Sequence, residues 1–133
     1  MFLLDINACI KILNGSSDAL VRRMQTHALN EIALCSVVKA ELLYGARKSA
    51  RVSSNLKLLE HFFSPLVSIP FDDTCAQHYG TIRALLERTG NTIGPNDMLI
   101  AATALAHDLT LVTHNVGEFL RVPGLRVEDW EID

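Results

Sequence analysis

The stretch LTLVT at residues 109–113 decides the fold class, because it is a short apolar run rich in β-branched residues. Such a run predicts a buried strand. Similar runs are FLL at residues 2–4, IALC at 32–35, LVSI at 66–69 and the shorter LRV at 125–127. Between these runs, apolar residues recur at helical spacing. Short strands that alternate with helices predict an α/β fold, in which a short parallel sheet is flanked by helices on both faces.

Start and stop signals delimit the expected helices. Ser17 and Ser36 are candidate N-caps, Pro65 and Gly90 end helices, and Pro95 is well placed in a first helical turn. The expected helices cover residues 8–13, 18–27, 37–48, 51–63, 74–88 and 95–106. Neither a repeat nor a linker interrupts this order. We therefore expect residues 1–133 to form one domain.

The composition excludes several protein classes. Of the 133 residues, 49% are hydrophobic, which suits a packed core and argues against disorder. No apolar run approaches the ~18 residues that span a bilayer, and the N-terminus lacks the basic segment of a signal peptide. These features predict a cytoplasmic protein without a membrane partner. Cys9, Cys35 and Cys75 include no Cys-x-x-Cys pair, so we expect buried reduced thiols and no zinc site.

Charge is distributed unevenly along the chain. The net charge of −3 does not by itself indicate a nucleic-acid binder, but residues 1–60 carry +3 and residues 61–133 carry −6. The basic half contains a cluster formed by Lys39, Arg47, Lys48, Arg51 and Lys57. This cluster either follows a phosphate backbone or forms an ordinary solvated helix face.

Three carboxylates occupy positions that need a physical reason. Asp5 directly follows a buried strand, Glu41 interrupts an apolar helical stretch, and Asp97 lies in a first helical turn. Each has an ordinary explanation when taken alone: a helix cap, a surface or salt-bridge position, and a favourable charge at a helix N-terminus, respectively. Because the carboxyl ends of parallel strands share one edge of a sheet, we expect these segments to converge.

Converging carboxylates predict a metal site. They repel one another, and a hard divalent cation relieves that repulsion. Mg²⁺ prefers one or two protein carboxylates plus water, leaves room for phosphate oxygens, and has Mn²⁺ as a substitute. Such an ion activates water and stabilises a leaving oxygen. The three acids therefore predict metal-dependent hydrolysis of phosphodiester bonds.

Four blocks carry a resemblance to a known family over the whole chain. They are FLLDIN at residues 2–7, SVVKAELLYGA at 36–46, IGPNDMLIAA at 93–102 and LVTHNVGEF at 111–119. With these blocks the sequence resembles a PIN-domain ribonuclease, specifically a VapC-type toxin of a type II toxin–antitoxin pair. The resemblance implies a magnesium-dependent endoribonuclease that cleaves a structured RNA such as tRNA and inhibits translation. It further implies a homodimer and a VapB-type antitoxin as the neutralising partner.

The resemblance also assigns roles to individual residues. The metal-binding acids of the family fall on Asp5, Glu41 and Asp97, while its fourth acidic position falls on Asn115. Glu118 is then either a catalytic replacement for that acid or an ordinary loop residue. Two further side chains, Asn7 and Thr113, are expected to hold the ligands by hydrogen bonds, as is Asn115. The family usually has Thr where this chain has Ile6, which removes a hydroxyl beside the first acid.

Other residues near these motifs have additional interpretations. His114 lies beside the expected site and is a candidate RNA contact. The remaining histidines, His27, His61, His78 and His107, are expected to be structural or surface residues. Tyr44 and Trp130 are candidates for stacking on bases, with a core or interface position as the alternative for Tyr44.

Competing functions fit the sequence less well. An aspartyl-nucleophile phosphatase usually has Asp-x-Asp where this chain has DIN, and a receiver domain usually has an early acidic pair and a late Lys. The alternative from another class is a catalytically weak PIN-fold module that binds RNA or a protein partner. Ile6 and Asn115 motivate that alternative, since both depart from the family pattern.

Overall fold

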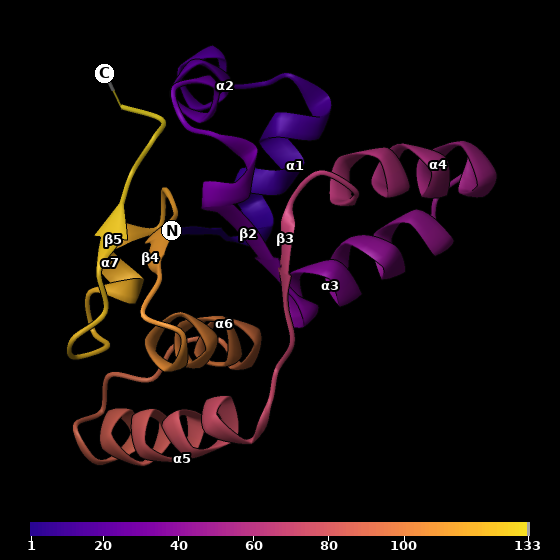
Figure 1. Cartoon of the computed structure of the whole chain (residues 1–133). Helices are drawn as coiled ribbons and strands as arrows, with labels where there is room; N and C mark the ends of the chain where they lie inside the picture. The colour runs from indigo at the N-terminus through magenta and orange to yellow at the C-terminus, as the bar shows by residue number, and fades with distance from the viewer. Residues whose placement is uncertain (133) are drawn as a thin grey trace.

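The computed structural model describes residues 1–132 and contains a five-stranded parallel sheet (Figure 1). The strands are β1 (Phe2–Leu4), β2 (Ile32–Cys35), β3 (Val67–Ile69), β4 (Thr110–Val112) and β5 (Val127–Glu128), in the spatial order β3-β2-β1-β4-β5. Leu3 pairs with Ala33 of β2 and with Leu111 of β4, so β1 is the central strand. The predicted α/β class is confirmed.

Helices cover both faces of the sheet. They are α1 (Ile6–Asn14), α2 (Asp18–Gln25), α3 (Ser36–Arg47), α4 (Val52–Phe63), α5 (Asp73–Arg88), α6 (Pro95–Ala106) and α7 (Val116–Phe119), with a 3-10 turn, η1, at Leu29–Glu31. Figure 1 shows α1 and α2 on one side of the strands and α5 and α6 on the other. The α3–α4 pair projects beyond β3 as a lobe.

The connections reverse direction between β1 and β4. From β1 the chain continues to β2 and β3 on one side, and it then returns through α5 and α6 to β4 on the other side of β1. The backbone N–H of Asp5 donates a 3.1 Å hydrogen bond to the carbonyl of Val112, so the carboxyl ends of β1 and β4 lie side by side. Such a switch point leaves a crevice in which ligands bind in open α/β sheets.

Helix α6 is central to the core. Its residues 100–102 and 104 are 0% exposed, because α5 covers it on one side and other core elements cover the rest. Three of these four residues are alanines, whose small side chains allow neighbouring backbones to approach closely. A helix fixed in this way holds its N-terminal residues, including Asp97, in a definite place at the sheet edge.

Several local expectations can be checked against the structure. Ser17 caps α2, since its hydroxyl accepts a hydrogen bond from Leu20 N–H. The expectation for Ser36 is wrong, because Ser36 is already the first residue of α3 and the N-cap is Cys35. Base stacking by Trp130 is also wrong: its ring is 1% exposed and stacks on His27 at 5.1 Å. The three cysteines are buried free thiols, as predicted.

Within residues 1–132, none of the helices combines the length and the apolar character that crossing a bilayer requires.

Candidate active site

Asp5 stands at the switch point and is buried, with 4% of its surface exposed. Its Oδ1 accepts a 2.8 Å hydrogen bond from Ala8 N–H, so it does cap α1. Burial raises the pKa of Asp5, while hydrogen bonds from Thr113 and Ala8 lower it only in part. A buried carboxylate whose anion remains disfavoured is stabilised by any cation that reaches it.

Asp97 lies in the first turn of α6, half-buried. Burial, then the carboxylate of Glu118, and then that of Asp5 raise the pKa of Asp97 to about 7. Acids from three separate segments therefore act on one another at this edge of the sheet. The expected convergence of Asp5 and Asp97 is present in the structure.

One backbone donor and one side-chain donor hold Glu118 in place. Its Oε1 accepts a 3.1 Å hydrogen bond from Gly94 N–H, and its Oε2 accepts one from the side-chain amide of Asn115. A Cβ placed on Gly94 would lie 3.6 Å from Oδ2 of Asp97 and 4.0 Å from Oε1 of Glu118. Both carboxylates therefore lie over the loop that leads into α6.

The segment that carries Glu118 is the short helix α7 at residues 116–119, and Gly117 within it does not have a positive φ. Helix geometry brings positions three apart to the same side, which is why Asn115 and Glu118 meet. Both side chains therefore lie beside the carboxyl end of β4.

Glu41 is joined to the cluster through an amide. Its Oε1 accepts a 2.9 Å hydrogen bond from Nδ2 of Asn96, the residue before Asp97. Glu41 is half-buried on α3 and is not among the groups that raise the pKa of Asp97. Among the four predicted acids it is thus the most loosely coupled. Sequence reasoning missed Asn96 and the Gly94 amide, whose only signal was their place directly before Asp97.

The three residues expected to hold the acids by hydrogen bonds differ in burial and in the contacts that they make. Thr113 is buried, and its hydroxyl accepts a 3.0 Å hydrogen bond from Asn115 N–H besides bonding Asp5. Asn115 is exposed and bonds Glu118. Asn7 is exposed in the first turn of α1, and Ile6 beside it is half-buried. Thr113 and Asn115 therefore tie β4 to the acids, whereas Asn7 points to solvent-accessible surface.

A polar rim borders Asp5 on the β5 side. Nδ1 of His114 lies 2.9 Å from Oδ2 of Asp129, and Nζ of Lys11 lies 2.5 Å from Oε1 of Glu131. The His114 side chain is 57% exposed, so its other ring nitrogen can face a ligand. This rim places a cation and an imidazole next to the carboxylates.

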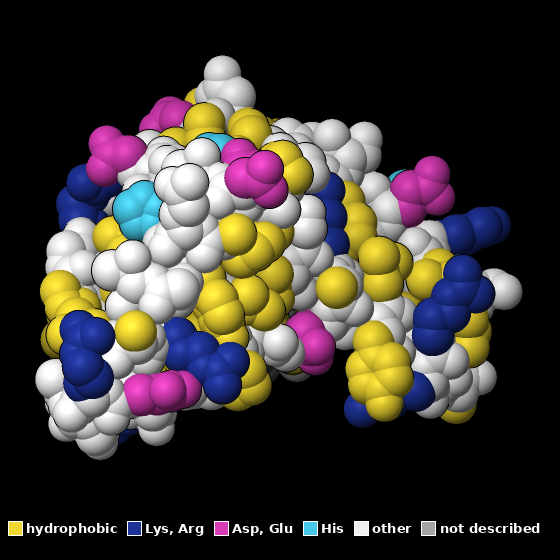
Figure 2. All heavy atoms as spheres, turned by 90° about the horizontal axis from the view of Figure 1, so that it is seen from below, with side chains coloured by type: hydrophobic (Ala, Val, Ile, Leu, Met, Phe, Trp, Pro, Cys, Tyr) yellow, Lys and Arg dark blue, Asp and Glu magenta, His cyan; other side chains and the backbone are white. Residues whose placement is uncertain are grey.

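The α3–α4 lobe and the turn between its helices carry the predicted basic cluster. In Figure 2 the surface is hollowed between this lobe, at the right, and the rest of the molecule, and Lys and Arg side chains gather on the lobe. Of the predicted cluster, Lys39 is engaged with Ser68 at 2.8 Å, whereas Arg47, Lys48, Arg51 and Lys57 are exposed. Tyr44 is 61% exposed, which excludes a core position for it in this chain.

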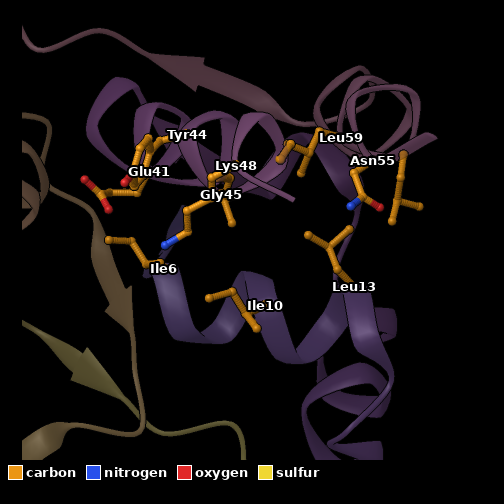
Figure 3. A pocket seen from close by; sticks show the side chains of 12 residues that line it. Ile6, Ile10, Leu13, Glu41, Tyr44, Gly45, Lys48, Asn55 and Leu59 are labelled. Carbon is orange, nitrogen blue, oxygen red and sulfur yellow. The ribbon is translucent and has the colours of Figure 1, made fainter. Parts of the chain in front are cut away.

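An apolar groove of about 420 Å³ separates α1 from the lobe. In Figure 3, Ile6, Ile10 and Leu13 of α1 face α3 and α4 across it. Glu41 lies at one end of the groove, where the groove meets the acidic cluster. The groove thus leads from an apolar surface to the carboxylates.

Comparison with known proteins agrees with this architecture. The PIN domain family matches residues 2–125. The chain belongs to the PIN-domain family. Within that family it is similar to ribonuclease VapC2 of Rickettsia felis, with 41% identity over 98% of both chains. It is also similar to the tRNA(fMet)-specific endonuclease VapC of Salmonella typhimurium, with 39% identity over 97% of both.

A solved structure supports the same assignment for this VapC-type PIN domain. The crystal structure of VapBC2 from Rickettsia felis, bound to a DNA fragment from its promoter, matches with a TM-score of 0.91 and 41% identity. The match covers 97% of this chain and 98% of that one. The predicted family and the PIN-like fold are therefore confirmed.

Proposed function

We propose that this PIN domain is a magnesium-dependent endoribonuclease toxin that an antitoxin restrains. The observation that carries the proposal is the cluster of Asp5, Asp97 and Glu118 at the β1–β4 switch point, with Glu41 joined through Asn96. Relatives at about 40% identity are named ribonuclease and endonuclease, which supports nuclease chemistry.

The residues present fit a hard divalent cation. All donors in the cluster are carboxylate oxygens, and burial together with the neighbouring carboxylates already raises the pKa of Asp97 to about 7. Asp5, Asp97 and Glu41 would hold Mg²⁺, or Mn²⁺ in its place, together with water. When bound, the ion supplies positive charge for the scissile phosphate and an acidified water.

The chain's own residues position the reacting groups. Glu118, fixed by the Gly94 amide and by Asn115, adds its negative charge beside Asp97. Thr113 keeps Asp5 oriented toward the cluster. Because the pKa of Asp97 is raised to about 7, a bound cation would favour the ionised form of this carboxyl.

A structured RNA such as tRNA is the proposed substrate, and its cleavage would inhibit translation. The name of the Salmonella relative specifies tRNA(fMet). The exposed Arg47, Lys48 and Arg51 on the lobe supply the phosphate contacts, with Tyr44 available for stacking. The competing function is a catalytically weak module that only binds RNA or a partner, which Ile6 and Asn115 motivate.

The apolar groove between α1, α3 and α4 is the proposed site for a VapB-type antitoxin. In the Rickettsia felis structure VapC2 is found with VapB2. An amphipathic segment can place its apolar side chains on Ile10 and Leu58, and an Arg from it can reach Glu41 at the groove end. A homodimer in the cytoplasm completes the proposal.

Cleavage of RNA by purified protein tests the enzymatic part. Total RNA should be cut with Mg²⁺ and left intact with excess EDTA, and Asp97→Asn should slow cleavage by more than about 100-fold. Asp18→Asn is the matched control, because Asp18 also lies in a first helical turn but on α2. Full activity of Asp97→Asn, or in EDTA, would refute the proposal; no cleavage by the folded parent would favour the binding module.

A further inference from the structure

Asp72, Cys75 and His107 bring three kinds of donor together at the end of α6 that lies away from Asp97. Asp72 is the N-cap of α5, Cys75 lies in the first turn of α5, and His107 is the C-cap of α6. One ligand atom from each residue lies within 4.8 Å of the other two. His107 follows Asp97 by about 15 Å along the helix axis, so this cluster is separate from the carboxylates.

His107 presents a buried nitrogen without a hydrogen bond. Its Nε2 atom is shielded from solvent and has no hydrogen-bond partner among residues 1–132, although it lies 3.4 Å from Oδ2 of Asp72. Buried polar atoms are normally bonded, so this one needs an explanation. An oxygen and a nitrogen bound to one tetrahedral Zn²⁺ are about 3.4 Å apart, given bonds of about 2.0–2.1 Å.

Local structure fixes the other two donors. Oδ1 of Asp72 accepts a 3.0 Å hydrogen bond from Cys75 N–H, which leaves Oδ2 to face His107. Cys75 is 0% exposed, and its sulfur contacts the carbonyl of Pro70 at 3.8 Å as well as the side chains of Asp72 and Thr103. The Asp72 side chain is 43% exposed, so water can reach the same point.

We propose that Asp72, Cys75 and His107 bind a transition-metal ion of the zinc type, with water as the fourth ligand. Carboxylate, imidazole and thiolate together suit Zn²⁺, whereas Mg²⁺ and Ca²⁺ take oxygen ligands. The sequence argument against a zinc site relied on the missing Cys-x-x-Cys pair, and these ligands come from two helices instead. The ion joins the start of α5 to the end of α6, and its binding does not depend on RNA cleavage.

Cobalt substitution tests this site in the full-length protein. One equivalent of Co²⁺ added to reduced, chelator-stripped protein should give a sulfur-to-cobalt charge-transfer band, which equimolar Zn²⁺ should abolish. Zn²⁺ at a hundred times its dissociation constant should raise Tm by about 10 °C. Cys75→Ser should lose the band and His107→Gln should weaken binding at least about tenfold.

Two controls separate this site from other donors. Cys9→Ser should keep the band, because Cys9 is another buried thiol without such neighbours. Asp97→Asn should keep it too, because the carboxylate cluster contains no sulfur. A folded parent without the band, a band that survives Cys75→Ser, or one lost in Asp97→Asn would overturn the proposal. If Cys75→Ser fails to fold, the half-buried His107→Gln variant decides.

Discussion

Asp97 shares a hydrogen bond with Glu118, and this contact ranks after burial among the causes that raise the pKa of Asp97 to about 7. The two residues come from α6 and α7, which meet only in the folded chain. Because the raised pKa of Asp97 disfavours its anion, ionising this carboxyl costs free energy in the absence of a cation.

The metal-free protein should lose stability as pH rises from about 4 to about 7. The folded state keeps a proton on Asp97 that the unfolded chain, with an ordinary pKa of 3.8, has already released. Asp97→Asn should therefore flatten this part of the pH profile and raise the metal-free Tm at pH 8 by a few degrees. Thermal unfolding in EDTA measures this, with Asp18→Asn as control. An unchanged or lower Tm for Asp97→Asn at pH 8 would contradict it.

Magnesium should stabilise the protein more at pH 8 than at pH 6. At pH 6 Asp97, with its pKa raised to about 7, is mostly protonated, so ion binding at pH 6 must also displace that proton. Tm measured against Mg²⁺ concentration at both pH values gives the comparison. Asp97→Asn should show little dependence on Mg²⁺ at either pH, and an equal shift at pH 6 and pH 8 would argue against coupling between the ion and this pair.

Glu118→Gln should slow RNA cleavage by about 10–100-fold, whereas Asn115→Ala should slow it by less than about tenfold. Gly94 N–H and the Asn115 amide both donate hydrogen bonds to Glu118 in the parent. The glutamine side chain would turn its own N–H₂ group toward one of these donors, and that hydrogen bond would be lost. Part of the loss should be recovered at high Mg²⁺. Kinetics on one fixed RNA across a magnesium titration decide this, and Glu118→Gln with parental rates throughout would make Glu118 an ordinary surface acid.

Asn115→Asp should retain activity only at high Mg²⁺. The family pattern alone suggests that this change keeps or raises activity, because it restores the usual acid. The structure adds a cost, since Asn115 donates to Glu118 and an aspartate there replaces the donor by a like charge. The same titration measures it: half-maximal activity should need more Mg²⁺ than in the parent. Equal magnesium requirements would show that the amide donor is dispensable.

Leu58→Asp should weaken binding of the VapB-type partner at least about tenfold without changing RNA cleavage. Leu58 lines the groove and is 48% exposed, so a charge there disturbs the docking surface more than the core. Leu29→Asp is the matched control, because Leu29 is 50% exposed and lies on η1 outside the groove. Calorimetric titration of the partner into each variant provides the affinities. Equal affinities would place the antitoxin elsewhere.

Sequence pattern predicted the elements with strong local signals. The runs around Leu3, Leu34 and Leu111 are short and apolar because parallel strands are covered on both faces, and that burial is visible in the composition. Asp5 and Asp97 were found because each carboxylate directly adjoins an apolar segment. Helix α7 was missed, since four residues with a glycine among them offer too short a pattern for helical spacing to show.

Local sequence pattern could not predict the contacts between segments that are distant in the sequence. Neither the amide of Asn96 on Glu41 nor the Gly94 N–H on Glu118 has a local signature, because each depends on how α6 is placed against α3 and α7. Trp130 shows the same limit. A tryptophan near the C-terminus looks available for bases, yet its ring stacks on His27 and meets Phe2 edge-on, two residues from the other end of the chain.

The position of β1 between β2 and β4 has a consequence for biosynthesis. The ribosome delivers Asp5 before the strand that aligns its neighbour Thr113 and before the helix that carries Glu118. A nascent chain that still lacks β4 and α7 therefore exposes isolated acids that cannot act in concert. With the proposed activity, the domain can cut RNA only after both elements have been synthesised, and a fragment that lacks them should not cut.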